Sequence, residues 1–384
     1  MGRALFKVLV LFAVGLIVSN CMVVTQKEQN SVEIPAADFY VSPQGNDSWS
    51  GQLAFPKPDG TDGPFATINR AKEAVRLKLK ELNQAKASKN ASAEAPEERK
   101  VTQSVTIDII QILIRGGRYE LTEPLIFTPE DSGNDALQVR YSAYPREVPV
   151  ISGGKKITGM QVTKENYWQV TIPEVKEGKW NFSQLFVNNQ RRYRPRLPEE
   201  GYYRILKDVP PTEKAKGKGY DCFCFNKGEI DRNWQNTEDV EVLVFHNWNA
   251  SRMKIAEIDE KNNVVTFTKW TCSPSAWAGL VANLKYLVIN VKEGLKKPGQ
   301  WYLDRKTGIL TYIPFKGESL NQCEIVAPKI DQILILQGLP DKEYVQNIHF
   351  KGLVFEHTNW NLPPEGLSIS QAEVSMSAAV YALA

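Results

Sequence analysis

A succession of short apolar runs, separated by turn-forming residues, limits the fold of this chain more than any other feature. The runs at 105–114, 125–127, 137–141 and 148–151 are rich in β-branched, leucine and aromatic residues, and Gly, Pro, Asn or Asp stand between them. Such runs predict short β-strands. No amphipathic helix stands among them, which disfavours an alternating α/β sheet. We therefore expect an all-β protein whose strands form the first coils of a parallel β-helix.

One helix precedes these strands, and together they make up residues 38–154. Apolar residues recur at three- and four-residue spacing and predict one apolar stripe, formed by Ile68, Ala71, Val75, Leu79 and Leu82. Thr61 or Asp62 can cap the helix, and Pro64 suits its first turn. We expect this capping helix to cover the open end of the first coil. Residues 84–104 keep no period and predict a solvated loop.

Residues 155–328 follow a different pattern, in which apolar and polar residues often alternate. Lys261-Asn262-Asn263 separates two such runs, and a second polar turn lies at 304–308. Each turn predicts an antiparallel hairpin. We therefore expect an antiparallel β domain inserted into the scaffold, whose coils resume at 329–384.

The first 21 residues predict a targeting segment rather than part of the fold. Arg3 and Lys7 precede an apolar run at 8–18 that is too short to span a bilayer as a helix. Cys21 stands where a lipoprotein signal places its acylated cysteine; alternatively, it leaves with an ordinary secretory signal. Residues 22–37 then form a tether. The expected location is secreted, periplasmic or at the cell surface, with a lipid anchor as the only membrane contact.

Composition and charge exclude several classes of function. The chain has 384 residues, 42% hydrophobic and 24% charged, which are values of a globular protein. A net charge of +3 gives no reason to expect nucleic acid as a partner. Cys222 and Cys224 do not have zinc-site spacing, and the three histidines are far apart. We expect no metal and no cofactor, and interpret the two thiols as half-buried strand residues rather than a redox pair.

Two segments carry candidate residues for binding a sugar. His246 and Trp248 would share one face of a strand, and Trp248 could stack on a sugar ring. The alternative is that Trp248 packs into a core while its polar neighbours hold a turn. Trp277, in a loop at 273–279, is a candidate for stacking at the edge of a groove. The arginine-rich run 191–196 either meets an acidic sugar or bridges the insertion to the coils.

A set of segments, taken in order, resembles secreted bacterial right-handed β-helix proteins. They lie at 39–51, 61–67, 114–119, 185–192, 248–252, 299–304 and 350–355. The resemblance is closest to family 141 of the glycoside hydrolases, which carries an insertion domain at this place, and it covers residues 38–384. It implies a right-handed parallel β-helix of the pectate-lyase-like (pectin lyase) fold. It also implies hydrolysis of plant cell-wall glycans, with α-L-fucosidase and xylanase activities among the relatives.

The chain departs from this family pattern in two places. Ile289 stands where many relatives have a Glu before an Asn, which removes the support for a substrate role of that strand. The sequence also stops at Ala384 within an apolar run, with no polar segment to cover a last coil. The resemblance places the two catalytic carboxylates on later coils. We therefore expect a C-terminally truncated chain that is inactive by itself.

Three functions follow from this pattern, all with a polysaccharide or oligosaccharide as the partner. Glycoside hydrolysis needs two carboxylates, and Glu356, at a predicted strand end, is the candidate within this chain. The alternative is that Glu356 is a solvent-facing side chain. A polysaccharide lyase would need clustered Asp residues for Ca²⁺, and the sequence has no such cluster. The third function is a non-catalytic glycan-binding module.

Overall fold

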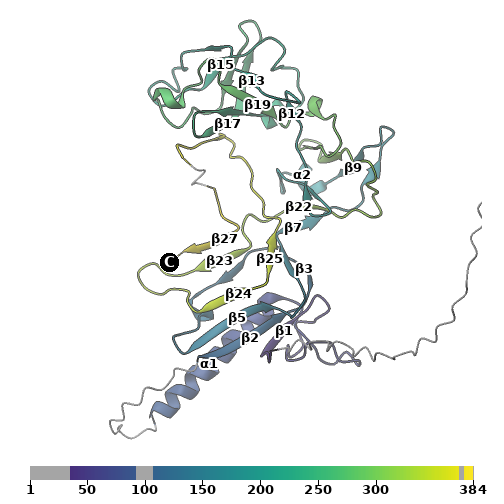
Figure 1. Ribbon diagram of the computed structural model, residues 1–384, viewed down its shortest axis with the longest axis vertical. Helices are drawn as coiled ribbons and strands as arrows, with labels where there is room; N and C mark the ends of the chain where they lie inside the picture. The colour runs from purple at the N-terminus through teal and green to yellow at the C-terminus, as the bar shows by residue number, and fades with distance from the viewer. Residues whose placement is uncertain (1–34, 92–106, 372–375, 384) are drawn as a thin grey trace, which may run out of the picture. The chain divides into compact units, whose positions relative to one another are not determined.

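The computed structural model describes residues 35–91, 107–371 and 376–383 (Figure 1). In these ranges the α-helices are α1 (Ile68–Ala91) and α2 (Pro173–Lys176), and strands dominate the rest, which confirms the all-β class. A membrane-spanning helix, long and apolar enough to cross a bilayer, does not occur in the described parts of the chain. The predicted targeting segment with Cys21, and nearly all of the predicted tether, lie outside the described residues.

Three parallel sheets form the scaffold. The first contains β1 (Phe39–Val41), β2 (Asp108–Ile114), β5 (Leu137–Ala143) and β24 (Ile348–Lys351), which lie side by side in Figure 1. The second contains β3 (Gly117–Glu120), β6 (Pro149–Ser152) and β25 (Val354–Glu356). The third contains β4 (Leu125–Phe127), β23 (Leu334–Gln337) and β27 (Val380–Leu383).

The chain visits these sheets in a constant order. It passes through β2, β3 and β4, then β5 and β6, and after the segment 153–333 through β23, β24, β25 and β27. Aromatic rings fill the space between the sheets. Tyr141 and Phe350 stack with centroids 5.6 Å apart, and Phe127 meets them edge-on at 5.3 and 5.2 Å. The repeated order follows from short strands joined by tight turns, as the sequence pattern predicts.

Strand β2 differs from the prediction at its start. Residues 112–114 are buried, as expected for a strand covered on both faces, but Ile107 and Ile109 are 43% and 42% exposed. The first two residues of the predicted run lie outside the described ranges. The early part of β2 therefore has one solvent-facing side.

Helix α1 confirms the predicted stripe and corrects both predicted ends. Its buried residues belong to the same core as β2 and β5, namely Ile68, Ala71, Val75 and Leu79. The cap is Thr67, whose Oγ1 accepts a hydrogen bond from the Arg70 N–H at 3.1 Å, rather than Thr61 or Asp62. Asp62 instead accepts from the Ser50 N–H at 2.8 Å and holds a loop. The helix also continues to Ala91, because Ala, Lys and Gln favour helix even without an apolar stripe.

Antiparallel sheets occupy the segment between β6 and β23. One contains β8 (Gln161–Val162), β9 (Trp168–Thr171), β20 (Trp301–Asp304) and β21 (Ile309–Tyr312). Another contains β7 (Gly154–Lys156), β10 (Phe186–Val187), β11 (Gln190–Arg191) and β22 (Ile325–Pro328). The largest contains β12 (Arg196–Leu197), β13 (Tyr203–Arg204), β14 (Lys207–Asp208), β15 (Cys222–Cys224), β16 (Glu241–Phe245), β17 (Ala250–Asp259), β18 (Val264–Phe267), β19 (Lys285–Ile289) and β26 (Leu367–Ser368).

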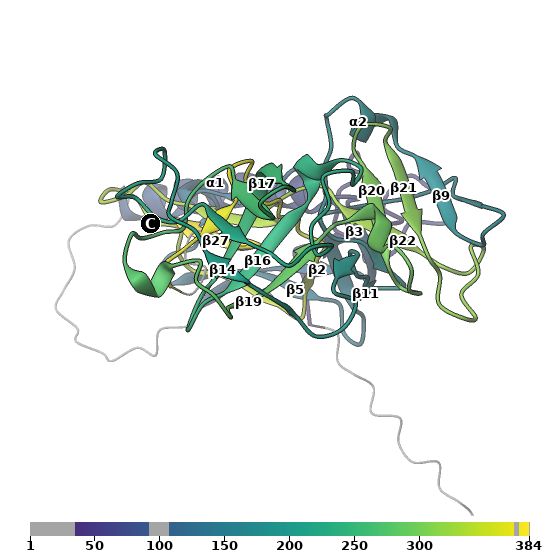
Figure 2. The ribbon, with the colours of Figure 1, turned by 90° about the horizontal axis from the view of Figure 1, so that it is seen from above.

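Both predicted hairpins are confirmed. Strands β17 and β18 pair antiparallel across the 261–263 turn. Strands β20 and β21 pair antiparallel across the 304–308 turn (Figure 2). Two apolar cores lie within these sheets, one around Phe223 and Tyr286 and the other around Trp168 and Trp301. The boundaries of a separate domain at 155–328 stay a prediction.

One segment, residues 358–371, connects the parallel sheets to the largest antiparallel sheet. It follows β25 and includes β26, which pairs antiparallel with β17. The Ser183 hydroxyl donates to the Trp360 carbonyl, and the Asn359 side chain donates to the Asn181 carbonyl at 3.1 Å. This connecting segment forms one wall of the site described next.

Candidate functional site

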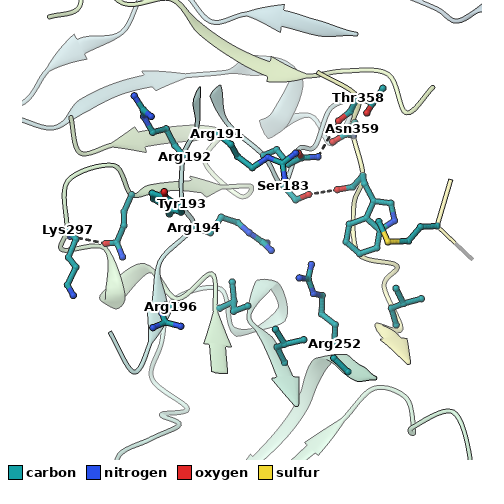
Figure 3. A pocket seen from close by; sticks show the side chains of 18 of the residues that line it. Ser183, Arg191, Arg192, Tyr193, Arg194, Arg196, Arg252, Lys297, Thr358 and Asn359 are labelled. Carbon is teal, nitrogen blue, oxygen red and sulfur yellow. Dashed lines mark hydrogen bonds between the residues drawn. The ribbon is translucent and has the colours of Figure 1, made fainter. Parts of the chain in front are cut away.

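A cavity of about 990 Å³ lies where four parts of the chain meet (Figure 3). Its walls are the loop and strands at 183–199, strands β16, β17 and β19, the residues at 297–315, and the connecting segment with Met376 and Ser377. Six cationic side chains line it: Arg191, Arg192, Arg194, Arg196, Arg252 and Lys297. Glu199 is the one carboxylate among the described lining residues. We call this space the arginine cavity.

Arg194 and Arg252 point toward the middle of the cavity from opposite sides (Figure 3). Arg194 binds the buried carboxylate of Glu241 through both guanidinium nitrogens, at 2.7 and 3.0 Å. Arg252 lies 3.8 Å from the same carboxylate. Burial alone would raise the pKa of Glu241, but Arg194 and then Arg252 and Lys254 more than offset burial and hold that pKa below its usual value. Glu241 is therefore an anion at neutral pH.

Arg192 forms its contacts with other residues of the protein interior. Its Nε donates to the Tyr312 hydroxyl at 2.9 Å, its Nη2 pairs with Glu318 at 2.6 Å, and its guanidinium lies 5.0 Å from the Phe315 ring centroid. Arg192 is itself buried. Its role is to hold strands together at the wall of the cavity.

Arg191 and Arg196 have a different environment from Arg192 and Arg194. Arg191 is exposed and its guanidinium lies 5.5 Å from the Phe186 ring centroid, while Arg196 donates to the Glu199 carbonyl at 3.3 Å. Within residues 35–91, 107–371 and 376–383, neither forms an ion pair with a carboxylate. Among the described residues, the cavity therefore carries positive charge at Arg191 and Arg196 that is not paired with a carboxylate.

Aromatic and amide groups complete the lining. Tyr193 is 64% exposed and Phe315 38% exposed, and the half-buried Trp360 ring lies 5.6 Å from the Arg252 guanidinium. The Gln184 amide donates to the Thr358 carbonyl at 3.2 Å, and Asn359 carries a buried carbonyl oxygen without a partner in the described structure. Flat apolar faces beside hydrogen-bonding groups suit a ligand that has both kinds of surface.

Glu356 lies outside the arginine cavity, at the end of β25. Its Oε1 is 3.4 Å from Arg118 Nη2, and its Oε2 accepts from the Asn189 amide at 3.3 Å. Arg118 Nη2 also pairs with Glu324 at 3.0 Å. Glu356 is thus a half-buried, ion-paired carboxylate with a second carboxylate close by, and not an isolated solvent-facing side chain.

His357 follows Glu356 and is buried. Its Nδ1 lies 3.0 Å from the Ser152 Oγ, and its ring packs edge-on against Phe186 at 4.6 Å. Burial, and to a lesser degree the charge of Arg118, lowers the pKa of His357 to about 4. The ring is therefore neutral at pH 7.

The structure brings Trp248 and Trp277 together but corrects the local geometry expected around them. Residues 246–249 form the turn between β16 and β17 and not a strand, so two-residue alternation does not apply. The two indoles stack with centroids 5.1 Å apart, and the Trp248 indole donates to the Ser370 carbonyl at 3.1 Å. Trp248 remains 60% exposed beside a hollow of about 440 Å³. His246 lines the same hollow, and its Nε2 lies 2.8 Å from Ser251 Oγ.

The cysteines outside the N-terminal segment are free thiols. Cys222 and Cys224 lie on β15, and burial first, with Asp221 beside it, raises the pKa of Cys222 to about 11. A thiol with so high a pKa is a poor nucleophile at neutral pH. No group of three or more His, Cys, Asp or Glu side chains suited to a metal occurs in the part of the chain that the structure describes.

The sequence pointed to the run 191–196 but not to the residues that surround it. Glu241, Arg252 and Trp360 come from strands and a loop far along the chain. The arginines could be found from the sequence because their charge is concentrated in one short run. The residues of the other walls could not, since they are distant in sequence and only folding brings them near.

Comparison with known proteins identifies the fold. No protein-family model matches this chain, and no curated protein matches it. The structure is similar to a solved glycoside hydrolase, with a TM-score of 0.65 and 22% identity, over 86% of this chain and 52% of that chain. A second solved structure, a complex of XylC with xylose, has a TM-score of 0.31 and 18% identity, over 85% of this chain and 36% of that chain.

This chain has the fold of a glycoside hydrolase. It spans about half the length of that similar structure.

Proposed function

We propose that this protein is carbohydrate-active and binds a glycan in the arginine cavity. The observation that carries the proposal is the fold shared with a glycoside hydrolase over 86% of the chain. A ligand cavity of this size, with exposed aromatic rings and amide groups, has room for several sugar units. The same proposal includes an activity like that of family 141. This activity is the cleavage of plant cell-wall glycans, as by a fucosidase or a xylanase.

The proposal includes the finer architecture. Three parallel sheets visited in a constant order support a parallel β-helix of the pectate-lyase-like type. A right-handed winding is expected because nearly all crossovers between parallel strands are right-handed. Helix α1 would be the N-terminal cap, and residues 155–328 would be the inserted antiparallel domain.

Binding is the part of this function that the cavity supports best. The Glu199 carboxylate at its edge pairs with Lys296 at 3.3 Å and Lys297 at 3.5 Å. Glycoside hydrolysis normally needs a pair of carboxyl groups, and Glu199 is the one carboxylate among the described lining residues. A non-catalytic glycan-binding role is therefore the second candidate function for these residues. For hydrolysis within the described ranges, the candidate carboxylates are Glu356 and its neighbour Glu324, which share Arg118.

A second contact with the glycan is proposed at the Trp248 platform, formed by Trp248 stacked on Trp277. Its hollow and the arginine cavity share Ala250 as a lining residue, so one oligosaccharide could extend over both. Trp248 would offer its exposed face to a sugar ring, and His246 would lie at the side of that ring.

Isothermal titration calorimetry of the purified chain with a panel of plant cell-wall oligosaccharides tests glycan binding. At least one glycan is expected to bind, and Tyr193→Ala is expected to weaken it about tenfold, the equivalent of 1.4 kcal/mol. Tyr193 is suited to this test because it is exposed in the cavity, so its loss leaves the core intact. Tyr344→Ala, at a 51% exposed tyrosine outside the cavity, is the matched control. If no glycan in the panel binds, the proposal fails.

Secretion and lipid anchoring at Cys21 are proposed on the sequence alone. Expression of the whole chain with a Cys21→Ser variant would test them. The original chain should partition with the membrane fraction and incorporate labelled palmitate, whereas the variant should do neither. Equal labelling of both chains would exclude Cys21 as the anchor.

A further inference from the structure

We infer that the arginine cavity selects a glycan that carries an anionic group, held by Arg196 and Arg191. The inference rests on the proposed function, since it takes the ligand of this cavity to be a glycan. The anionic group is a uronate carboxylate or a sulfate ester, because both present oxygen atoms that guanidinium groups bind.

The first step is the difference between the arginines. Arg192 and Arg194 have carboxylate partners, Glu318 and Glu241, so they are already neutralised by the protein. Arg191 and Arg196 line the same cavity without a carboxylate within ion-pair distance in the described residues. An arginine whose only role is to bridge two elements would be expected to resemble Arg192.

The second step is a comparison with the neighbouring cavity. A space of about 480 Å³ shares Arg194 and Ser183 with the arginine cavity. Its lining balances Arg194, Lys254 and Arg305 with three carboxylates, those of Glu238, Asp239 and Glu241. The described lining of the arginine cavity has six cationic side chains and one carboxylate, so an excess of positive charge distinguishes it from the neighbouring space.

The third step is the surroundings of Arg196. It is half-buried, and its one acceptor among the described residues is the neutral carbonyl of Glu199 at 3.3 Å. The other guanidinium N–H groups are available to a ligand. In partly buried surroundings a charge-assisted hydrogen bond to an anion is stronger than one to a neutral hydroxyl. The cavity therefore favours an acidic sugar over a neutral one of the same shape.

The test compares an acidic glycan with its neutral ester. Calorimetric titration of the full chain with an oligogalacturonate and with its fully methyl-esterified form measures the effect of replacing each carboxylate by a methyl ester. We expect the acid to bind at least about tenfold more tightly at low salt and to lose part of that advantage as salt is raised. A neutral xylo-oligosaccharide and a sulfated galactan oligosaccharide complete the set.

The variant Arg196→Gln should weaken binding of the acidic ligand about tenfold and so reduce the preference for the acid over its methyl ester. Arg191→Gln should also weaken binding of the acidic ligand. Arg204→Gln is the matched control, because Arg204 also donates to a backbone carbonyl, that of Asn283 at 2.8 Å, but does not line the cavity.

The outcomes separate this inference from the proposed function. Tight binding of the sulfated ligand alone supports the anion site and identifies sulfate as its group. Detectable and equal binding of the acid and its ester with no tighter binding of the sulfated ligand, or tightest binding of the neutral glycan, overturns the anion site while the glycan-binding proposal stands. Failure of all four ligands to bind overturns both.

Discussion

At the level of single residues, charge pairing decides what each cavity arginine does. Glu241 is almost fully buried and holds Arg194 in a two-pronged ion pair, with Arg252 nearby. A buried charge that loses its partner is costly, since it can neither reach water nor find another counter-ion. The pairing thus makes Arg194 a fixed part of the wall.

The substitution Glu241→Gln tests this role. It should lower the free energy of unfolding by about 3–5 kcal/mol, because it leaves the largely buried Arg194 side chain, 14% exposed, without a counter-charge. Urea denaturation measures the change. Glu213→Gln, in the exposed pair with Lys216, should change stability by less than about 1 kcal/mol. Equal effects of the two substitutions would contradict the assignment.

The dependence of stability on pH in acid provides a second test of the role of Glu241. Its folded pKa lies below its usual value, so its contribution is present above the unfolded pKa and is lost as pH falls through the folded pKa. The original chain should therefore lose stability below about pH 4.5 more steeply than Glu241→Gln does.

His357 should affect stability over a higher pH range. Its folded pKa of about 4 lies below the usual 6.5, so the unfolded chain binds the proton more readily between these values. Stability is then complete above about pH 6.5 and falls as pH drops toward 4, by at most about 1.4 kcal/mol per unit. Denaturation curves at a series of pH values should show this slope, and His357→Asn should abolish it. Asn suits the left-handed backbone at this position, where φ is +63°.

At the level of elements, the connecting segment 358–371 provides one of the four walls of the cavity. Strand β26 pairs with β17 at Leu367 and Ser368, and Gly366 makes the turn that leads into it. Gly366 has a φ of +85°, and a Cβ there would lie 2.7 Å from the Arg252 carbonyl oxygen. Only glycine avoids both the strain and the contact.

Gly366→Ala should therefore loosen β26 from β17. Hydrogen exchange should become faster at the amides of 367–368 and 251–252, and glycan affinity should fall. Gly217→Ala is the matched control, because Gly217 has a φ of +74° but open space around its Cα. It should cost only the backbone strain, about 1–2 kcal/mol. The same exchange rates in both variants would mean that the contact with Arg252 has no role.

At the level of the whole molecule, three apolar cores raise the question of how many units unfold together. Phe127 lies in the core of the parallel sheets and Phe223 in a core of the antiparallel sheets, and both are fully buried. If residues 155–328 form a domain, each core should unfold in a transition of its own.

Scanning calorimetry of Phe127→Ala and Phe223→Ala tests that division. Each should destabilise its own unit by about 3–5 kcal/mol, so each variant should shift a different transition. A single transition that both variants shift alike would show that the insertion and the coils fold as one unit.

The sequence by itself determined what depends on neighbours along the chain. The short strands, the apolar stripe of α1 and the two hairpins follow from period and turn chemistry, so they could be predicted without a structure. Prediction from the sequence was wrong where one local pattern is compatible with two structures. Residues 246–249 form a turn instead of the expected strand, and residues 84–91 continue the helix instead of forming a loop.

Only the tertiary structure decided the site. Arg194 meets Glu241, Arg192 meets Glu318, and Trp248 meets Trp277 across long stretches of sequence. Whether an arginine is paired within the protein or can bind a ligand depends on whether the fold places a carboxylate beside it. No local pattern encodes that, because ion pairs and ring stacking act through space and the sequence distance between partners is free to vary.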